Sequence, residues 1–265
     1  MQTVSKDGTK IAFDKVGAGP AVILVTGALA YRAIDPTMAQ LAELLGKHFT
    51  VYNYDRRGRG DSGDTQPFAR EREMEDLQAL VEDAGGKAMV FGFSSGSVLS
   101  LDTTAVTPGI TRLGVYEPPF IVDDRRRPVP ANYAEHVTTL VAKGKRDEAV
   151  EYFLTEVVGI PAEYIGGMKQ DQTTWSGMTG VAHTIAYDAA VVGNVSQGKP
   201  LPVDRWAKVT APVLVADGGA SDAWMHHAAD ALAKVLPHAS RRTLEGQTHT
   251  ADPQVLAPVI IEFFK

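Results

Sequence analysis

The residues Gly92-Phe93-Ser94-Ser95-Gly96 decide the fold, because they join an apolar run to a helical stretch through a tight turn. The apolar run is Ala88-Met89-Val90-Phe91, and the helical stretch covers Val98 to Val106. Glycine on either side lets the backbone fold sharply, so the central serine projects above the sheet edge. The pattern predicts a strand, a nucleophile turn and a helix, with Ser94 rather than Ser95 as the nucleophile. An ordinary glycine-rich turn is the alternative interpretation.

A serine hydroxyl needs a neighbouring base at neutral pH, and His249 is the predicted base. It lies in Gly246-Gln247-Thr248-His249-Thr250, between a predicted strand ending near Leu244 and the last helix. Loops at strand ends carry catalytic groups while the sheet holds them still. Five other histidines are less suited to act as the base, because they lie near a helix end, in a predicted surface helix or in the predicted insertion. They are His48, His136, His183, His226 and His227.

Attack on a carbonyl creates an oxyanion, which needs preorganised N–H donors. The N–H of Ser95, directly after the nucleophile, is the predicted first donor. The turn Thr26-Gly27-Ala28-Leu29 follows the apolar run Ala21 to Val25, and the N–H of Ala28 is the predicted second donor. Simple termination of the strand is the alternative explanation of this turn.

The remaining apolar runs predict an α/β fold with a mostly parallel central sheet flanked by helices. Lys10 to Val16 alternates and predicts an outer antiparallel strand. Amphipathic helices are predicted around Met38, around Leu77 and near the C-terminus. Continuous apolar runs predict buried parallel strands over Ala21–Val25, Thr50–Tyr54, Ala88–Phe91, Leu113–Tyr116 and Val213–Ala216.

No buried strand is predicted in residues 123–205, where helical patterns such as Tyr133–Ala142 and Glu148–Val158 follow one another. We therefore predict a helical insertion over the sheet at 123–205. Residues 1–122 and 206–265 would form the core domain on either side of it.

Composition narrows the function classes. The 265 residues include 44% hydrophobic and 22% charged residues and no apolar stretch long enough to span a bilayer, so no membrane partner is expected. No secretory leader is apparent at the start, and we expect a cytoplasmic protein. The net charge of −6 argues against a nucleic-acid partner. We interpret Arg125-Arg126-Arg127 as a solvated loop, with an anion site as the alternative.

The sequence predicts no cofactor and no metal. It has no cysteine and no H-E-x-x-H motif, and the adjacent His226 and His227 point to different faces of a helix. Gly17-Ala18-Gly19 begins like a dinucleotide fingerprint, but position 22 is valine and the segment enters a strand instead of leaving one. Oligomeric state is left open between monomer and homodimer.

Taken together, these residues resemble the α/β-hydrolase superfamily from Gly17 to the C-terminal helix. The turn at Ser94 is similar to the family's nucleophile elbow. Tyr54 to Ser62 resembles a family segment that shapes a turn more than it performs chemistry. Thr26-Gly27 stands where many members have His-Gly. The insertion is similar to the family's cap domain, which covers the active site.

The resemblance leaves the acid of a Ser-His-acid triad open among three carboxylates. Many relatives place an aspartate as Gly-x-x-Asp after the strand Pro212 to Ala216, but here Gly218-Gly219-Ala220-Ser221-Asp222 has serine at that position. Another subset, including zearalenone lactonases, takes a glutamate directly after the strand that follows the elbow helix, and Glu117 stands there. We rank Glu117 first, Asp222 second and Asp217 third.

The resemblance implies a hydrolase of ester, lactone or thioester bonds that acts through an acyl-enzyme. A small, largely apolar substrate is expected. The alternative is a non-hydrolytic member of the fold, either an isomerase or cyclase of a biosynthetic pathway or a small-molecule binding protein. Residues expected to line the pocket, with ordinary packing as the competing explanation, are Leu29, Trp175, Met178, His183 and Tyr187.

Overall fold

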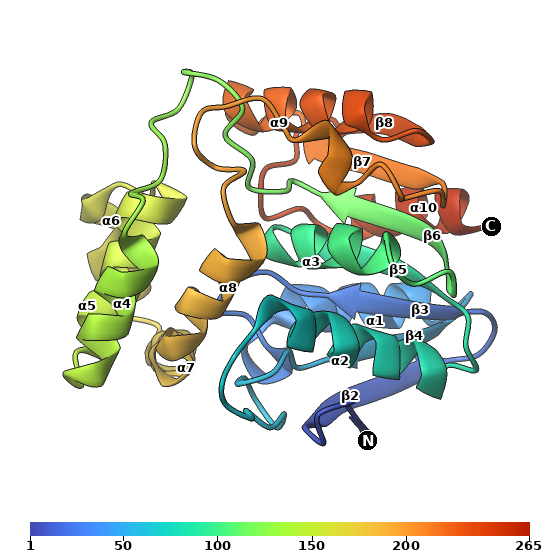
Figure 1. Ribbon diagram of the computed structural model, residues 1–265, viewed down its shortest axis with the longest axis horizontal. Coiled ribbons are helices and arrows are strands. Elements are labelled where there is room, and N and C mark those ends of the chain that lie inside the picture. The colour runs from blue at the N-terminus through green and yellow to red at the C-terminus, as the bar shows by residue number, and fades with distance from the viewer.

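The computed structural model describes residues 1–265 and contains one sheet of eight strands in the order β1-β2-β4-β3-β5-β6-β7-β8 (Figure 1). β1 and β2 are antiparallel to their neighbours, and the other six strands run parallel to one another. The strands are β1 Gln2–Val4, β2 Lys10–Gly17, β3 Ala21–Val25, β4 Thr50–Tyr54, β5 Ala88–Phe93, β6 Ile110–Tyr116, β7 Val213–Gly218 and β8 Ala239–Leu244.

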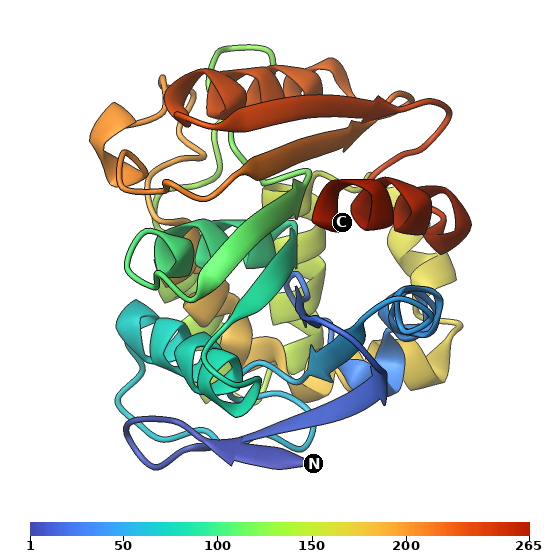
Figure 2. The same ribbon diagram turned by 90° about the vertical axis from the view of Figure 1, so that its right-hand side faces the viewer.

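Helices cover both faces of the sheet, as parallel strands require. α1 (Pro36–Leu45) and α10 (Pro253–Phe264) pack together on one face, in a core cluster with Phe49 and Phe91. The other face carries α2 (Arg70–Asp83), α3 (Ser95–Thr104) and α9 (Ala223–Val235). Figure 2 shows α1 and α10 on the opposite side of the strands from α2 and α3. The α/β-hydrolase fold expected from the sequence is confirmed.

The apolar runs predicted the parallel strands closely, but the antiparallel edge differs from the expectation. β2 is antiparallel to β4 as expected, but it is not the outermost strand, because Gln2–Val4 pairs along its outer side. Three residues at the chain start give too short a pattern for sequence periodicity to detect.

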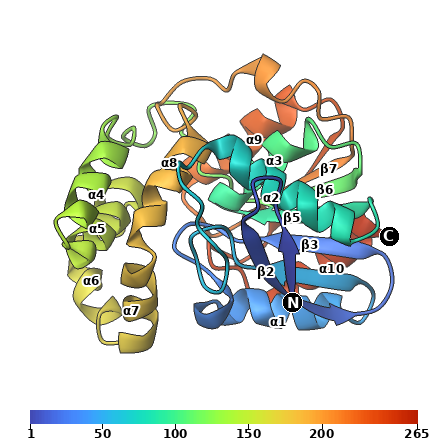
Figure 3. The same ribbon diagram turned by 60° about the horizontal axis from the view of Figure 1, so that its bottom comes forward.

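Between β6 and β7 the chain forms a helical layer, which we define as α4 to α8 with the turns that join them. Figures 1 and 3 show α4 to α7 set to one side of the sheet, with α8 between them and α3. The layer comprises α4 Tyr133–Ala142, α5 Arg146–Tyr152, a π-helical turn Phe153–Val158, α6 Ala162–Met168, α7 Gln172–Gly180 and α8 Ile185–Val192. Its core is a separate apolar cluster that includes Val137, Val150 and Ile185. No helix in the structure is both long and apolar enough to cross a membrane.

Candidate active site

Ser94 occupies a sharp turn between β5 and α3, with φ 52° and ψ −124°. The two flanking glycines make this turn possible. A Cβ on Gly92 would lie 2.7 Å from the carbonyl oxygen of Gly96, and a Cβ on Gly96 would lie 2.5 Å from the carbonyl oxygen of Thr26. A larger residue at Gly92 would collide with α3, and one at Gly96 would collide with the end of β3 and Thr26. The glycine spacing that predicted the turn therefore has a steric cause.

Backbone strain gathers around this turn. Only three non-glycine residues have positive φ, and they are Leu29 at 61°, Ser94 at 52° and Glu117 at 45°. They follow or end β3, β5 and β6, three neighbouring strands whose carboxyl ends meet at one edge of the sheet. Such conformations cost about 1 to 3 kcal/mol each and persist where the surrounding structure imposes them, often at functional sites.

His249 and Glu117 are paired. Nδ1 of His249 lies 2.8 Å from Oε2 of Glu117, whose side chain is fully buried while the imidazole stays 37% exposed. The hydroxyl of Tyr116 donates to the carbonyl oxygen of Thr248 at 2.7 Å, which ties the histidine loop to the end of β6. The ring of Phe93 packs against the imidazole at 5.0 Å. This arrangement fixes the ring with its Nε2 free.

The second oxygen of Glu117 is also satisfied. Its Oε1 accepts from the backbone N–H of Gly218 at 2.8 Å and from the hydroxyl of Ser221 at 2.5 Å. Ser221 stands at the position where many members of the resembled family have an aspartate. Here Ser221 donates a hydrogen bond to Glu117 instead. The residue that replaces the usual aspartate therefore supports the glutamate at the end of the neighbouring strand. The sequence analysis did not find this role of Ser221.

The two other candidate carboxylates lie apart from His249. Asp217 is fully buried, but Arg241 binds it with two hydrogen bonds, and His226 and Thr243 also contact it. Asp222 is exposed at the start of α9 and makes no hydrogen bond with the histidine. Geometry therefore favours Glu117, because it alone of the three contacts the imidazole.

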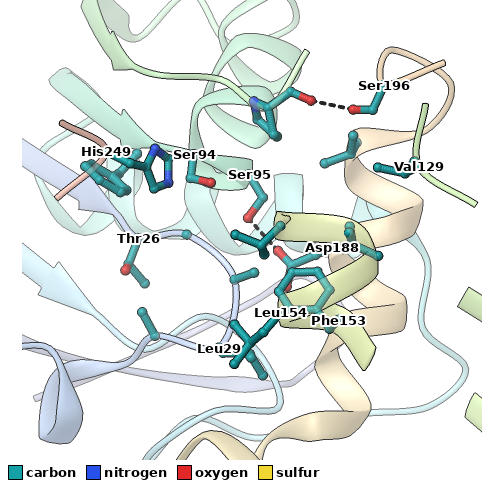
Figure 4. A pocket seen from close by; sticks show the side chains of 18 of the residues that line it. Thr26, Leu29, Ser94, Ser95, Val129, Phe153, Leu154, Asp188, Ser196 and His249 are labelled. Atoms are coloured by element: carbon teal, nitrogen blue, oxygen red, sulfur yellow. Dashed lines mark hydrogen bonds between the residues drawn. The ribbon is translucent and has the colours of Figure 1, made fainter. Parts of the chain in front are cut away.

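Ser94 and His249 lie beside each other at one end of a cavity (Figure 4). The serine hydroxyl makes no hydrogen bond with the imidazole in this structure. Proton transfer between them would require the serine side chain to turn toward Nε2. Such contacts are commonly long in unliganded enzymes and shorten when substrate binds.

The backbone N–H groups of two residues that line this cavity have no hydrogen-bond acceptor in the protein. Ser95 begins α3, where the first amides of the helix have no intrahelical acceptor. Ala28 lies in the turn after β3, and its N–H has no acceptor in the protein. The Thr26 hydroxyl donates to Asp35 at 3.1 Å, and this carboxylate caps α1. Ala28 and Ser95, the two residues predicted to supply oxyanion donors, thus line the same cavity as Ser94.

A buried ion network holds this turn. Asp188 of α8 accepts from Arg56 at 2.8 Å, from Arg59 at 2.6 Å and from the hydroxyl of Ser95 at 2.6 Å. Arg56 also forms two hydrogen bonds with Glu73. Burial alone raises the pKa of Asp188, but the charges of the two arginines outweigh it and keep this pKa below its usual value. The carboxylate is therefore ionised at neutral pH.

The same arginines bind the turn after β3 through its carbonyl oxygens. Arg59 donates to Gly27 at 2.5 Å and to Ala30 at 3.3 Å, and Arg56 donates to Thr26 at 3.4 Å. The segment Arg56-Arg57-Gly58-Arg59, within the stretch Tyr54 to Ser62, therefore shapes the turn after β3. Sequence analysis missed Asp188, although a lone carboxylate in the apolar stretch Ile185–Val192 is a signal of a buried partner.

The cavity has a volume of about 340 Å³ and mostly apolar walls. Figure 4 shows side chains of the helical layer, such as Phe153 and Leu154, opposite those of the sheet edge. Its polar or charged lining residues are Thr26, Asp35, Ser94, Ser95, Arg126, Tyr133, Asp188, Ser196 and His249. The dimensions suit a small organic molecule with a few polar groups.

Of the five pocket residues expected from the sequence, Leu29 and Met178 line the cavity and three do not. Trp175 packs within the helical layer and donates to Asp147 at 2.7 Å. Tyr187 stacks on Phe68 with ring centroids 3.9 Å apart, and His183 packs against the tyrosine edge-on. The prediction was wrong for these three because a helical pattern identifies a buried face but not the element that packs against it.

No group of three or more histidine, aspartate or glutamate side chains in the structure is arranged to hold a metal ion. The polar groups at the cavity end are instead a hydroxyl, an imidazole paired with a carboxylate, and two backbone amides. That set is suited to acyl transfer.

The model of the alpha/beta hydrolase family matches residues 22–259 of the sequence. The chain belongs to this family. Among curated proteins it resembles the uncharacterized hydrolase YraK of Bacillus subtilis (strain 168), with 25% identity over 169 residues. That match covers 58% of this chain and 61% of the relative, so the chain matches less than two thirds of the relative's length.

Solved structures agree with this fold. An alpha/beta hydrolase from Sphaerobacter thermophilus DSM 20745 is 52% identical, with a TM-score of 0.92 over the full length of both chains. A thermophilic esterase from Thermogutta terrifontis is 21% identical with a TM-score of 0.69, over 100% of this chain and 97% of that one. An enol-lactonase from Burkholderia xenovorans LB400 is 17% identical with a TM-score of 0.70, over 100% and 99%. The last two likenesses establish the fold alone.

Proposed function

We propose that this hydrolase cleaves carboxylic ester-type bonds, including lactones and thioesters, through a covalent intermediate on Ser94. The observation that carries the proposal is the pair of His249 and the buried Glu117, 2.8 Å apart, beside a strained serine turn. The fold shared with an esterase and an enol-lactonase supports the same bond class.

In the first half of the proposed reaction, the Ser94 hydroxyl attacks the substrate carbonyl carbon and His249 Nε2 takes its proton. The carbonyl oxygen becomes an oxyanion and accepts hydrogen bonds from the amides of Ala28 and Ser95. Collapse of this intermediate breaks the bond to the leaving group. His249 gives its proton to the departing oxygen or sulfur, which leaves as an alcohol or thiol.

In the second half, His249 deprotonates a water molecule that attacks the acyl-enzyme. A second oxyanion forms on the same amides, the bond to Ser94 breaks, and the serine recovers its proton from the imidazole. The carboxylic acid product then leaves. Throughout, Glu117 holds the Nδ1–H tautomer and stabilises the imidazolium, while Gly218 and Ser221 keep the glutamate in place.

We also infer that the helical layer, within residues 123–205, acts as a cap over the core domain of residues 1–122 and 206–265. It contributes one wall of the cavity, including Phe153, Leu154 and Met178. A mostly apolar space from which substrate displaces water strengthens the oxyanion hydrogen bonds. The substrate is accordingly a small molecule with a substantial apolar part.

Ser94→Ala tests the nucleophile. We expect loss of p-nitrophenyl ester turnover by at least ~10⁴-fold and loss of covalent labelling by a fluorophosphonate. Intact-protein mass spectrometry after exposure to an activated ester should detect a transient acyl adduct on the wild-type protein only. Labelling that persists in the variant would rule out Ser94, and an absent adduct on active wild type would favour a non-hydrolytic reaction.

Glu117→Gln tests the acid against a matched control. Replacing the carboxylate by an amide should lower kcat by about 10³-fold or more, because the histidine tautomer and its charged form lose their support. Asp222→Asn makes the same change of charge at an exposed site and should leave kcat within about twofold of wild type. A large loss in the control together with a small loss in the glutamate variant would exchange the two roles.

A further inference from the structure

One side chain in the cavity wall has no part in the proposed reaction. Arg126 is the only lysine or arginine that lines the cavity. It belongs to the loop between β6 and α4 and is half-buried, whereas its neighbours Arg125 and Arg127 are exposed. The structure therefore separates one arginine from the run that the sequence presents as a solvated loop.

Contacts on several sides hold the Arg126 guanidinium in place. It lies over the ring of Trp224, 4.3 Å from the ring centre. Its Nη2 donates to the carbonyl oxygens of Val157 and Val158 at 2.6 and 2.7 Å, where the π-helical turn ends. Gly159 leaves room for it, because a Cβ there would lie 3.0 Å from Nη2. Three of these neighbours, Trp224, Val157 and Val158, also line the cavity.

The remaining donors of this side chain are unused. A guanidinium has five N–H groups, and the two on Nη2 satisfy the valine carbonyls. The three on Nε and Nη1 have no acceptor in the protein, and no carboxylate lies within ion-pair distance. By contrast, Arg125 pairs with Asp123, and Arg127 lies 3.8 Å from Glu156.

A half-buried cation without a carboxylate partner is partly desolvated, and an anionic ligand in the cavity would supply the missing counter-charge. Burial lowers the pKa of Arg126, and only the more distant charge of Asp222 opposes this effect. The surroundings thus disfavour the charged form, although an arginine remains protonated at neutral pH. An anion entering the cavity would gain charge-assisted hydrogen bonds from the free N–H groups.

We propose that Arg126 binds a carboxylate carried by the substrate at a distance from the bond that is cleaved. This inference rests on the proposed function and narrows its substrate class to esters, lactones or thioesters that bear a free acid group, such as hemi-esters of dicarboxylic acids. One guanidinium with apolar walls around it matches one negative charge, so a carboxylate fits better than a doubly charged phosphate group. A cavity of about 340 Å³ limits the substrate to a short chain.

A substrate series gives the direct test. The monomethyl esters of succinate, glutarate, adipate and suberate are compared by pH-stat with methyl esters of equal length that end in a methyl group. We expect kcat/KM of the wild type to favour the hemi-ester by at least ~10-fold at one preferred length, the scale of one charge-assisted contact. The preferred length reports the span from Ser94 to the guanidinium.

Matched variants assign the preference to this side chain. Arg126→Met keeps an apolar stem on Trp224 but removes the charge, and it should abolish the preference for the hemi-ester. Arg127→Met removes the same charge from the next residue, which is exposed, and should keep the preference. Arg126→Lys should retain part of it, since an ammonium supplies the charge without the planar donors. Equal preferences in the two methionine variants would overturn the proposal.

A binding measurement separates this inference from the proposed reaction. Calorimetric titration of the Ser94→Ala protein with glutarate or adipate should give binding that is lost in Ser94→Ala/Arg126→Met and kept in Ser94→Ala/Arg127→Met. If the wild type cleaves neither ester but this pattern holds, the reaction is wrong and the carboxylate site stands. Absence of binding by the diacids, or equally tight binding of inorganic phosphate, would overturn the assignment to a carboxylate.

Discussion

Two arginine-rich segments of this chain look alike in sequence but differ in the fold. In Arg56-Arg57-Gly58-Arg59 every guanidinium is buried and meets at least one carboxylate. In Arg125-Arg126-Arg127 the outer two are exposed near carboxylates, and the middle one is half-buried without any. The first segment binds the turn after β3, and the second contributes Arg126 to the wall of the cavity.

The difference between the segments shows that the role of a buried arginine can be inferred from whether a carboxylate of the protein pairs with it. Arg56 and Arg59 are neutralised by Glu73 and Asp188, so their charges stabilise the protein's own turn and offer nothing to a ligand. Arg126 has no such partner, so its charge remains available. Both segments contact the helical layer, through Asp188 in one case and Val157 in the other.

Arg56→Met should give the largest effect on stability. The substitution leaves Glu73 buried without its bidentate partner, and removing one member of a buried ion pair costs about 3 to 5 kcal/mol. Urea unfolding followed by tryptophan fluorescence measures the loss. A loss below about 1 kcal/mol would mean that the buried Arg56 contributes no more to stability than an exposed arginine does, which would contradict the difference between the two segments.

Asp188→Asn should lower the free energy of unfolding by on the order of 3 kcal/mol at pH 7, and this loss should depend on pH. The pKa of Asp188 is lower in the folded protein than in the unfolded chain, so its contribution is complete above the unfolded pKa of about 3.9 and disappears as pH falls through the lower folded value. The difference in unfolding free energy between wild type and variant should therefore shrink toward pH 3. A difference that stays constant from pH 7 to pH 3 would contradict this origin.

Arg126→Met should have a much smaller effect on stability than on substrate preference. It loses two hydrogen bonds to carbonyl oxygens and a contact with Trp224, but it also removes a poorly solvated charge, so we expect a loss of no more than about 1 kcal/mol. The same urea titration measures it. A loss as large as that of Arg56→Met would indicate that this arginine, too, serves the fold.

Arg127→Met should give the smallest effect, within about 0.5 kcal/mol, because its side chain is 82% exposed and its ion pair is long. Added salt should not change the result measurably, since water already screens this charge. A clear destabilisation would show that the exposure of an arginine in this segment does not predict its contribution to stability.

The fold followed from local patterns. Five continuous apolar runs matched five parallel strands because a strand buried on both faces has few polar positions. The glycines around Ser94 were informative because a side chain at Gly92 would collide with α3 and one at Gly96 would collide with Thr26. Three residues at the chain start were missed, since β1 is too short to show a period.

The candidate site followed only partly. Ser94 and His249 were named from their places after a strand or before a helix, and Glu117 was ranked first from the resemblance to a subset of the family. Parallel strands bring such places together at one edge. The pocket residues were less predictable. Trp175, His183 and Tyr187 share the aromatic and polar character of a pocket wall, but they pack against Asp147, Phe68 and one another.

By itself, the sequence determined the elements, their order and the residues at strand ends, because these depend on periodicity and on the steric limits of glycine. Only the tertiary structure decided which charges are satisfied. Asp188 is far along the chain from Arg56, and Arg126 is next to two other arginines, so neither pairing nor its absence can be read from neighbours in sequence. Burial and pairing of charges depend on long-range packing, and they separate the arginines that hold this fold from the one that faces its cavity.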